Sequence, residues 1–256
     1  MYLEQISNIL LINGGFLGNP GLYSGEMGLV LFFSRYSRLS QKELYSEYSF
    51  DLIEKIQNNI HQETPIDYKQ GLTGIGSSFE YLVQNGFLEA DTDELLEEFD
   101  DRIFSFGRMT HLSIDELIGI GFYAIWRMAG GSVQADVILK KVLPKLVYFI
   151  NKRRKNNDFE DRTVAFIKDL IETQNLGMLS DILISIRSCR NRYPYGLEIN
   201  TYNRYLKQFS KNELSLHNAI DLSLQNGLAG FGMALMTEYD CDDSWISLIP
   251  KDLISY

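Results

Sequence analysis

The sequence predicts an all-α protein, one domain over residues 1–256 in which repeated helix pairs form an α/α toroid or an incomplete toroid. Three observations support this fold class. A glycine-rich motif recurs along the chain, helical periodicity dominates between its copies, and proline is scarce, with only 5 residues. An open superhelix of helix pairs is the alternative arrangement, and the pattern is compatible with both.

The glycine motif recurs at nearly regular intervals. Its copies are Gly71-Leu-Thr-Gly-Ile-Gly76, Gly227-Leu-Ala-Gly-Phe-Gly232, a longer Gly21-Leu-Tyr-Ser-Gly25-Glu-Met-Gly28, a short Gly119-Ile-Gly121 and a weak Asn175-Leu-Gly177. With the last glycine of each copy as anchor (28, 76, 121, 177, 232), the intervals are 48, 45, 56 and 55 residues. Such a period is typical of one supersecondary unit stacked repeatedly, because a single unit cannot bury its apolar face alone.

The segments between the motifs are predicted to be amphipathic outer helices. Residues 43–60 carry an apolar side of Phe50, Ile53, Ile56 and Ile60. Residues 91–106 carry Leu95, Leu96, Phe99, Ile103 and Phe104 on one stripe, with Asp91 or Thr92 as the N-cap. Residues 134–150 are also periodic, and Pro144 is expected to kink that helix.

The segments that follow the glycines are apolar on almost every side. They include residues 29–33, 77–83, 122–126 and 233–236. Helices of this kind are buried. Each repeat therefore reads as an outer helix, a glycine-rich turn and an inner helix. Glycine in the turn would let neighbouring backbones approach closely and would permit a positive φ.

Composition and charge limit the partners and the location. The net charge of −10 argues against nucleic acid as a partner. We expect no membrane span and no signal peptide, because no apolar run is long enough and no leader pattern is present. The two cysteines, Cys189 and Cys241, fit a reducing cytosol, so we expect a cytoplasmic protein. The basic run 152–155 is interpreted as a solvated loop, with a docking site for an acidic partner as the alternative.

The glycine motifs resemble those of the lanthionine synthetase C-like family of bacterial peptide cyclases. The resemblance rests on the motifs that begin at Gly21, Gly71 and Leu224, and on a closing Asp243-Ser-Trp245-Ile-Ser-Leu-Ile-Pro segment. It covers both ends of the chain and is weak between residues 130 and 215. Family members form a toroid of seven helix pairs and hold one zinc ion through two cysteines and a histidine. The zinc activates a peptide thiol for thioether formation.

This chain departs from the family at the zinc ligands. Neither Trp126 nor Trp245 precedes a cysteine, no Cys-His dipeptide occurs, and the turn after Gly71 has no histidine. The chain is also shorter, with about five repeats. The resemblance therefore implies the fold but not the catalytic zinc, and we predict no metal and no cofactor.

A zinc site of another kind is the alternative for the cysteines. Cys189 and Cys241 could meet His217, but their spacing is not that of zinc ligands. Burial as small side chains is the favoured interpretation of the cysteines.

Four carboxylates precede or begin the inner helices: Glu26, Asp115, Glu116 and Asp221. Paired carboxylates in a toroid cavity could hydrolyse glycosides. Acidic residues at helix N-termini also stabilise the helix dipole and the unpaired N–H groups there. The second interpretation is favoured, because no spacing requires two carboxylates to face each other.

A polar mouth is the candidate binding site. It comprises the residues in or beside the glycine turns, namely Tyr23, Ser24, Glu26, Thr73, Ser77, Ser78, Asp221 and Asn226. Converging helix N-termini are rich in N–H groups and suit a peptide carboxylate or a small anion. The alternative is that these residues cap helices and close turns.

The sequence thus predicts a non-catalytic lanthionine synthetase C-like protein that binds a peptide or a partner enzyme in a bacterial peptide-modification pathway. Two alternatives remain. One is a divergent, cyclase-like enzyme of the same lineage acting on a peptide. The other is a carbohydrate-active toroid that uses the mouth carboxylates.

Overall fold

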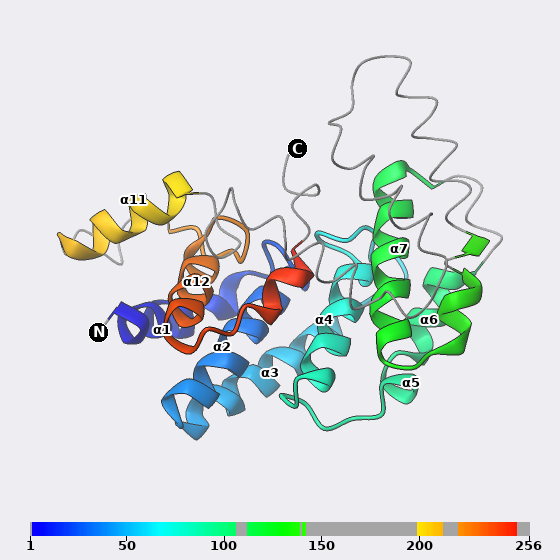
Figure 1. Cartoon of the computed structure of the whole chain (residues 1–256), viewed down its shortest axis with the longest axis horizontal. Helices are drawn as coiled ribbons and strands as arrows, with labels where there is room; N and C mark the ends of the chain where they lie inside the picture. The colour runs from blue at the N-terminus through cyan, green and yellow to red at the C-terminus, as the bar shows by residue number, and fades with distance from the viewer. Residues whose placement is uncertain (1, 106–111, 139, 142–198, 212–219, 250–256) are drawn as a thin grey trace, which may run out of the picture. The chain divides into compact units, whose positions relative to one another are not determined.

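The computed structural model describes residues 2–105, 112–138, 140–141, 199–211 and 220–249 (Figure 1). Within these ranges the chain is helical and contains no β-strand, which confirms the all-α class. The chain divides into two compact units, one of residues 1–64 and 189–249 (unit 1) and one of residues 65–188 and 250–256 (unit 2). The expected single domain stays a prediction. None of the described helices combines the length and the apolar character that a membrane span needs.

Unit 1 joins the two ends of the chain. Its elements are α1 (Tyr2–Asn13), η1 (Gly14–Phe16), α2 (Glu26–Ser40), α3 (Glu43–Asn59), α11 (Ile199–Ser210), α12 (Leu228–Asp240) and η6 (Ser244–Leu248). α2 and α3 form one helix pair, and α12 packs against both α1 and α2 (Figure 1). Helices from opposite ends of the sequence therefore share one core.

Unit 2 is built around two inner helices, α4 and α7. Its elements are α4 (Leu72–Gln84), α5 (Thr92–Leu95), α6 (Glu97–Phe104) and α7 (Ile114–Ala129), and residues 133–138 are also helical. α4 packs along α7, with α6 against α4 (Figure 1). The weak fifth glycine motif, the basic run 152–155 and the kink predicted at Pro144 lie outside the described residues.

The inner helices are buried as predicted. α2 is buried from Glu26 to Tyr36 and α4 from Leu72 to Leu82. Most of α12 is buried as well. These helices have no polar face for water, because other parts of the chain pack against them on every side.

The predicted apolar side of α3 is partly wrong. The buried residues of α3 are Tyr45, Ser49, Leu52 and Ile56, whereas Phe50 is 49% exposed. The buried set follows the helical spacing of three and four residues, and a serine belongs to it because Ser49 Oγ lies 2.8 Å from Ser34 Oγ of α2. The hydroxyl of Ser49 is thus buried with a partner, while the ring of Phe50 stays half-exposed.

The helix predicted over residues 91–106 is broken in two. Leu96, with φ −110° and ψ 11°, separates α5 from α6. Asp91 is the N-cap as expected, and its side chain accepts hydrogen bonds from the backbone N–H groups of Asp93 and Glu94. The apolar stripe still packs, since Leu96, Phe99, Ile103 and Phe104 are buried.

Three glycine motifs share one loop geometry. We call the seven residues before α2, α4 and α12 the lead-in loops (residues 19–25, 65–71 and 221–227). In each loop the first helical N–H donates to the carbonyl seven residues earlier: Glu26 to Asn19 at 2.7 Å, Leu72 to Pro65 at 2.9 Å and Leu228 to Asp221 at 2.7 Å. The repeat seen in the sequence is therefore a repeated backbone structure.

Space, and not a positive φ, explains the glycine that ends each lead-in loop. Gly25, Gly71 and Gly227 have φ values of −119°, −109° and −103°, so the expected positive φ is wrong for them. A Cβ on any of these glycines would overlap the backbone of its own loop. Within the three lead-in loops, a positive φ occurs only at Asn226, at 61°.

The fourth glycine motif starts its helix differently. α7 begins after Ser113, which forms a capping box with Glu116: the Ser113 N–H donates to Glu116 Oε2 at 2.7 Å, and the Glu116 N–H donates to Ser113 Oγ at 3.2 Å. Gly119 lies within the helix, where an added Cβ would be 2.7 Å from Thr73 Oγ1. Here glycine serves close helix packing.

The same helix-to-helix contact occurs once in each unit. In unit 2, an added Cβ on Gly76 of α4 would overlap the ring of Tyr123 of α7. In unit 1, an added Cβ on Gly232 of α12 would overlap the ring of Phe32 of α2. The unit 1 contact joins the last of the described inner helices to the first.

Candidate functional site

Two lead-in loops lie side by side in unit 1. The backbone N–H groups of Leu224 and Gln225 donate to the carbonyl of Tyr23 at 2.9 and 3.0 Å. A Cβ added to Gly28, in the first turn of α2, would be 2.8 Å from Leu224 Cβ. The starts of α2 and α12 are therefore in contact, and five of the eight predicted mouth residues lie there.

Polar residues lie at the surface of these paired loops. Ser24 and Asp221 are exposed, and Gln225 and Asn226 are partly exposed. We call these four residues the polar rim. Asp221 Oδ1 accepts a hydrogen bond from the Ser223 N–H at 2.9 Å, which stabilises the turn. Tyr23, also predicted for the mouth, is only 1% exposed and belongs to the core.

The predicted mouth residues of unit 2 are buried. Thr73, Ser77 and Ser78 have no exposed surface. Their hydroxyls donate to backbone carbonyls, Thr73 to Ile66 at 2.6 Å, Ser77 to Thr73 at 2.7 Å and Ser78 to Gly74 at 2.8 Å. These bonds agree with the structural interpretation, in which the hydroxyls close turns and pair with helix carbonyls and do not bind a ligand.

Glu26 is buried and faces α3 and η1. Its Oε1 lies 2.6 Å from Lys55 Nζ, at angles that are not those of a hydrogen bond, and the same Nζ donates to the Gly15 carbonyl at 2.7 Å. Glu26 has no exposed surface, whereas the Lys55 side chain is 37% exposed. Among the described residues, Glu26 Oε2 and Tyr48 Oη have no hydrogen-bond partner.

The other predicted carboxylates do not form a catalytic pair in the described residues. Glu116 is held in the capping box of α7, and Asp221 holds the turn of its lead-in loop. The side chain of Asp115 lies outside the described residues. Each carboxylate whose contacts are described is thus engaged with backbone or with a lysine, in the way acidic residues at helix starts usually are.

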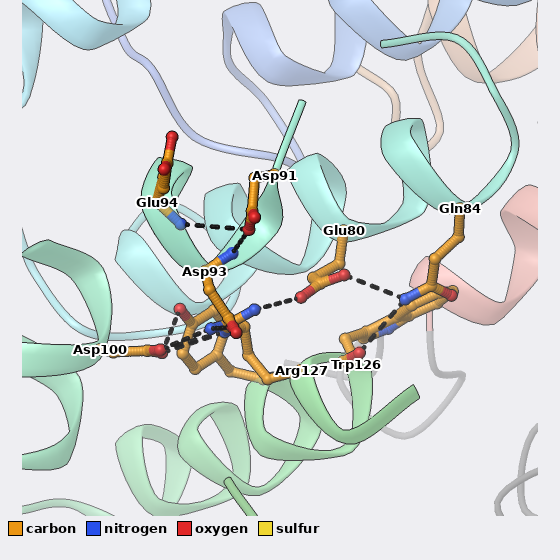
Figure 2. Close-up of polar contacts among 9 residues, drawn as sticks. Glu80, Gln84, Asp91, Asp93, Glu94, Asp100, Trp126 and Arg127 are labelled. Carbon is orange, nitrogen blue, oxygen red and sulfur yellow. Dashed lines mark hydrogen bonds and ion pairs between the residues drawn. The ribbon is translucent and has the colours of Figure 1, made fainter. Parts of the chain in front are cut away.

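A buried ion-pair network in unit 2 was not predicted from the sequence (Figure 2). Arg127 of α7, whose side chain is 1% exposed, donates from Nη1 to Glu80 Oε1 at 2.6 Å and from Nη2 to Asp100 Oδ2 at 2.7 Å. Nη2 also reaches Asp93 Oδ1 at 2.7 Å, and Tyr123 Oη donates to Asp100 Oδ1 at 2.7 Å. One guanidinium therefore holds three carboxylates from α4, α5 and α6.

Burial and charged partners together shift the pKa values of this network. Burial raises the pKa of Glu80, although hydrogen bonds from Arg127 and Gln84 lower it. Burial alone would lower the pKa of Arg127, but its bonds to Asp100, Glu80 and Asp93 raise it above its ordinary value. The pKa of Tyr123 is raised by burial and by Asp100. The sequence signal was Glu80, the single charged residue of α4, together with Arg127, the single basic residue of α7.

An arginine in unit 1 holds the segment that follows α12. Arg35 Nη2 of α2 lies 2.8 Å from Asp240 Oδ2 at the end of α12 and donates to the Asp242 carbonyl at 2.8 Å. Trp245 has no exposed surface, and its Nε1 donates to Thr237 Oγ1 at 2.9 Å. The tryptophan segment singled out in the sequence thus fastens η6 to α12.

The described residues contain no cluster of three His, Cys, Asp or Glu side chains arranged for a metal ion. Cys241 is exposed and ends α12 with φ 58°. Cys189 and His217 lie outside the described residues, so the zinc alternative stays untested. Comparison of the chain with protein-family models, curated proteins and solved structures found no match.

Proposed function

We propose that this chain is a non-catalytic protein of the lanthionine synthetase C-like type, and that its polar rim binds a peptide or a partner enzyme of a bacterial peptide-modification pathway. The observation that carries the proposal is the pair of hydrogen bonds from Leu224 and Gln225 to the Tyr23 carbonyl. They bring together two helix starts that are 202 residues apart in sequence (26 and 228).

The chemistry of the rim suits a polypeptide. Ser24 and Asn226 present a hydroxyl and an amide beside the N-termini of α2 and α12, where the helix dipoles favour carbonyl oxygens and carboxylates. Asp221 adds a carboxylate that can accept from a backbone N–H. Donors and acceptors together match a peptide backbone, which presents both.

The proposal includes a ring of helix pairs. It is supported by the repeated lead-in loops and by the contact of Gly232 with Phe32, which joins the last described inner helix to the first in the way that Gly76 and Tyr123 join α4 to α7. A last-to-first contact of this kind is what closure of a toroid requires, whereas the end helices of an open superhelix do not meet.

A non-catalytic role is favoured by what the carboxylates do. Glycoside hydrolysis requires two carboxyl groups on opposite sides of the bond that is cleaved. Of the mouth carboxylates in unit 1, Glu26 is buried against Lys55 and only Asp221 belongs to the rim. No observation in the described residues favours an enzyme.

The test is selection of short random peptides on the wild-type protein, followed by binding to two arginine variants. Ser24→Arg places a large cation on the rim, and Glu47→Arg places the same side chain at an exposed position of α3 as the matched control. We expect the selected peptides to bind the wild type and Glu47→Arg and to lose affinity for Ser24→Arg. Failure to enrich peptides, or equal binding to both variants, would contradict the proposal.

A further inference from the structure

Four groups from three elements of unit 1 meet around Glu26. They are the Glu26 carboxylate at the start of α2, the Gly15 carbonyl of η1, and Tyr48 and Lys55 of α3. The Lys55 ammonium bridges the first two, at 2.6 Å from Glu26 Oε1 and 2.7 Å from the Gly15 oxygen. We call these groups the Glu26 cluster. None of them belongs to the polar rim.

The cluster leaves two buried oxygens without partners. Among the described residues, nothing donates to Glu26 Oε2, and Tyr48 Oη has no hydrogen bond. Buried polar atoms are nearly always paired, because an unpaired one loses its hydration without compensation. A carboxylate oxygen can only accept, and a phenol oxygen can also accept. In the described part of the chain, Glu26 Oε2 therefore lacks a hydrogen-bond donor, and Tyr48 Oη can accept from the same group.

The electrostatics favour a donor that carries positive charge. The pKa of Tyr48 is raised by burial, by Glu26 and by Asp51, so both carboxylates act on the phenol oxygen. Lys55 neutralises one of these two charges through its contact with Glu26 Oε1. Asp51 is exposed, so its charge is solvated, and the buried Glu26 carboxylate is the group that a donor would meet. Hydrogen bonds from a cation to a carboxylate are stronger than those from a neutral donor, so an ammonium is the favoured partner.

The surroundings provide a way in. The Lys55 side chain is 37% exposed, and it is long and flexible, so its rotation uncovers the Glu26 carboxylate. Tyr48 Oη lies against η1, since a Cβ added to Gly14 would be 3.0 Å from it, and Leu29 Cδ1 already occupies the space beside this glycine at 2.5 Å.

We propose that the Glu26 cluster is a binding site for a primary ammonium group, which donates to Glu26 Oε2 and Tyr48 Oη. Lys55 shows that an ammonium is accommodated here, because its own Nζ forms an ion pair with Glu26 Oε1 and donates to the Gly15 carbonyl. Lys55 is therefore a neighbour of the bound amine and also its competitor for the carboxylate.

The test is thermal unfolding of the full chain in methylammonium chloride. Tetramethylammonium chloride, which has the same charge but no N–H donor, and sodium chloride at equal ionic strength are the controls. A ligand that binds only the folded state raises the Tm in a saturable way. We expect that rise with methylammonium alone. An equal response to all three salts would overturn the proposal and would assign the two oxygens to a bound water.

Two conservative variants locate the effect. Glu26→Gln keeps the shape of the side chain and removes its charge, and we expect it to weaken methylammonium binding about tenfold or more. Tyr48→Phe keeps the ring and removes the hydroxyl, and we expect a several-fold loss. Circular dichroism confirms that both variants are folded. A methylammonium response that both variants retain would place the amine elsewhere and refute the site.

Two further measurements define the amine. Lys55→Met keeps the aliphatic stem but removes the competing ammonium, so we expect tighter binding of methylammonium. Glycinamide carries an amine next to an amide, as a peptide N-terminus does. A response to glycinamide identifies a peptide amine, and a response to methylammonium alone identifies a small amine. The site does not rest on the proposed rim, because peptides selected on the rim can bind whether or not amines do.

Discussion

Gly232 of α12 lies directly against the ring of Phe32 of α2, so closely that a Cβ on the glycine would overlap the ring. The two residues are 200 positions apart (32 and 232) and belong to helices from opposite ends of the chain. The contact sets the distance between these inner helices. The Phe32 ring fills the space that a side chain at position 232 would otherwise need.

Gly232→Ala is expected to destabilise the protein by about 1–3 kcal/mol, the usual cost of an extra methyl group in a packed core. Urea unfolding monitored by circular dichroism measures the change. Gly15→Ala is the matched control, since an added Cβ there meets nothing within 4 Å. An unchanged unfolding midpoint for Gly232→Ala would show that α12 and α2 are less tightly packed than described.

Arg127→Leu is expected to destabilise unit 2 by about 3–5 kcal/mol, because it leaves buried carboxylates without their cation. The control is Lys140→Met. Lys140 is half-exposed and pairs with Asp136 one turn away, so its loss is expected to cost about 0.3–0.5 kcal/mol. Equal effects of the two substitutions in chemical denaturation would mean that the Arg127 network is solvated.

The stability of the protein is expected to depend on the ionisation of Glu80. Burial raises its pKa in the folded state above the ordinary value of 4.5. Between the two values the folded state binds more protons than the unfolded state, so the contribution of Glu80 is fully present below the ordinary pKa and is lost as the pH rises through the folded pKa.

This dependence is measured as the difference in unfolding free energy between the wild type and Glu80→Gln as a function of pH. We expect the difference to fall as the pH rises above about 4.5. A difference that instead rises with pH would mean that Arg127 lowers the pKa of Glu80 more than burial raises it.

Asn226 separates backbone strain from ligand binding on the rim. Its φ of 61° is in the left-handed region, which glycine adopts without strain and asparagine tolerates, but which costs other residues with a Cβ about 1–2 kcal/mol. We expect Asn226→Gly to keep the stability of the wild type and Asn226→Ala to lose about 1 kcal/mol. Thermal unfolding compares the two. If both variants weaken the binding of selected peptides, although Asn226→Gly keeps its stability, the amide side chain contacts the ligand.

Much of the local structure could be predicted from the sequence. The helix starts after Gly25, Gly71 and Gly227 follow from the recurring motif, and the Asp91 cap follows from residue type. These features depend on neighbours in the chain. The break at Leu96 was missed because the apolar stripe continues across it.

The candidate site could be predicted only in part. Ser24, Asp221 and Asn226 lie on the paired lead-in loops of unit 1, as a polar mouth requires. Glu26 was assigned to the same mouth because it adjoins Gly25, but its side chain turns to Lys55 of α3. A residue's position in a motif defines its backbone, whereas the direction of its side chain depends on which other helix supplies a partner.

The sequence alone determined the all-α class, the repeat and the buried character of the inner helices, because periodicity and glycine spacing act over one or two helical turns. Only the tertiary structure decided which charges meet. Arg127 and Glu80 are 47 residues apart, and no sequence pattern links the two positions. Burial makes their pairing obligatory, since a charge removed from water must find its counterpart within the folded chain.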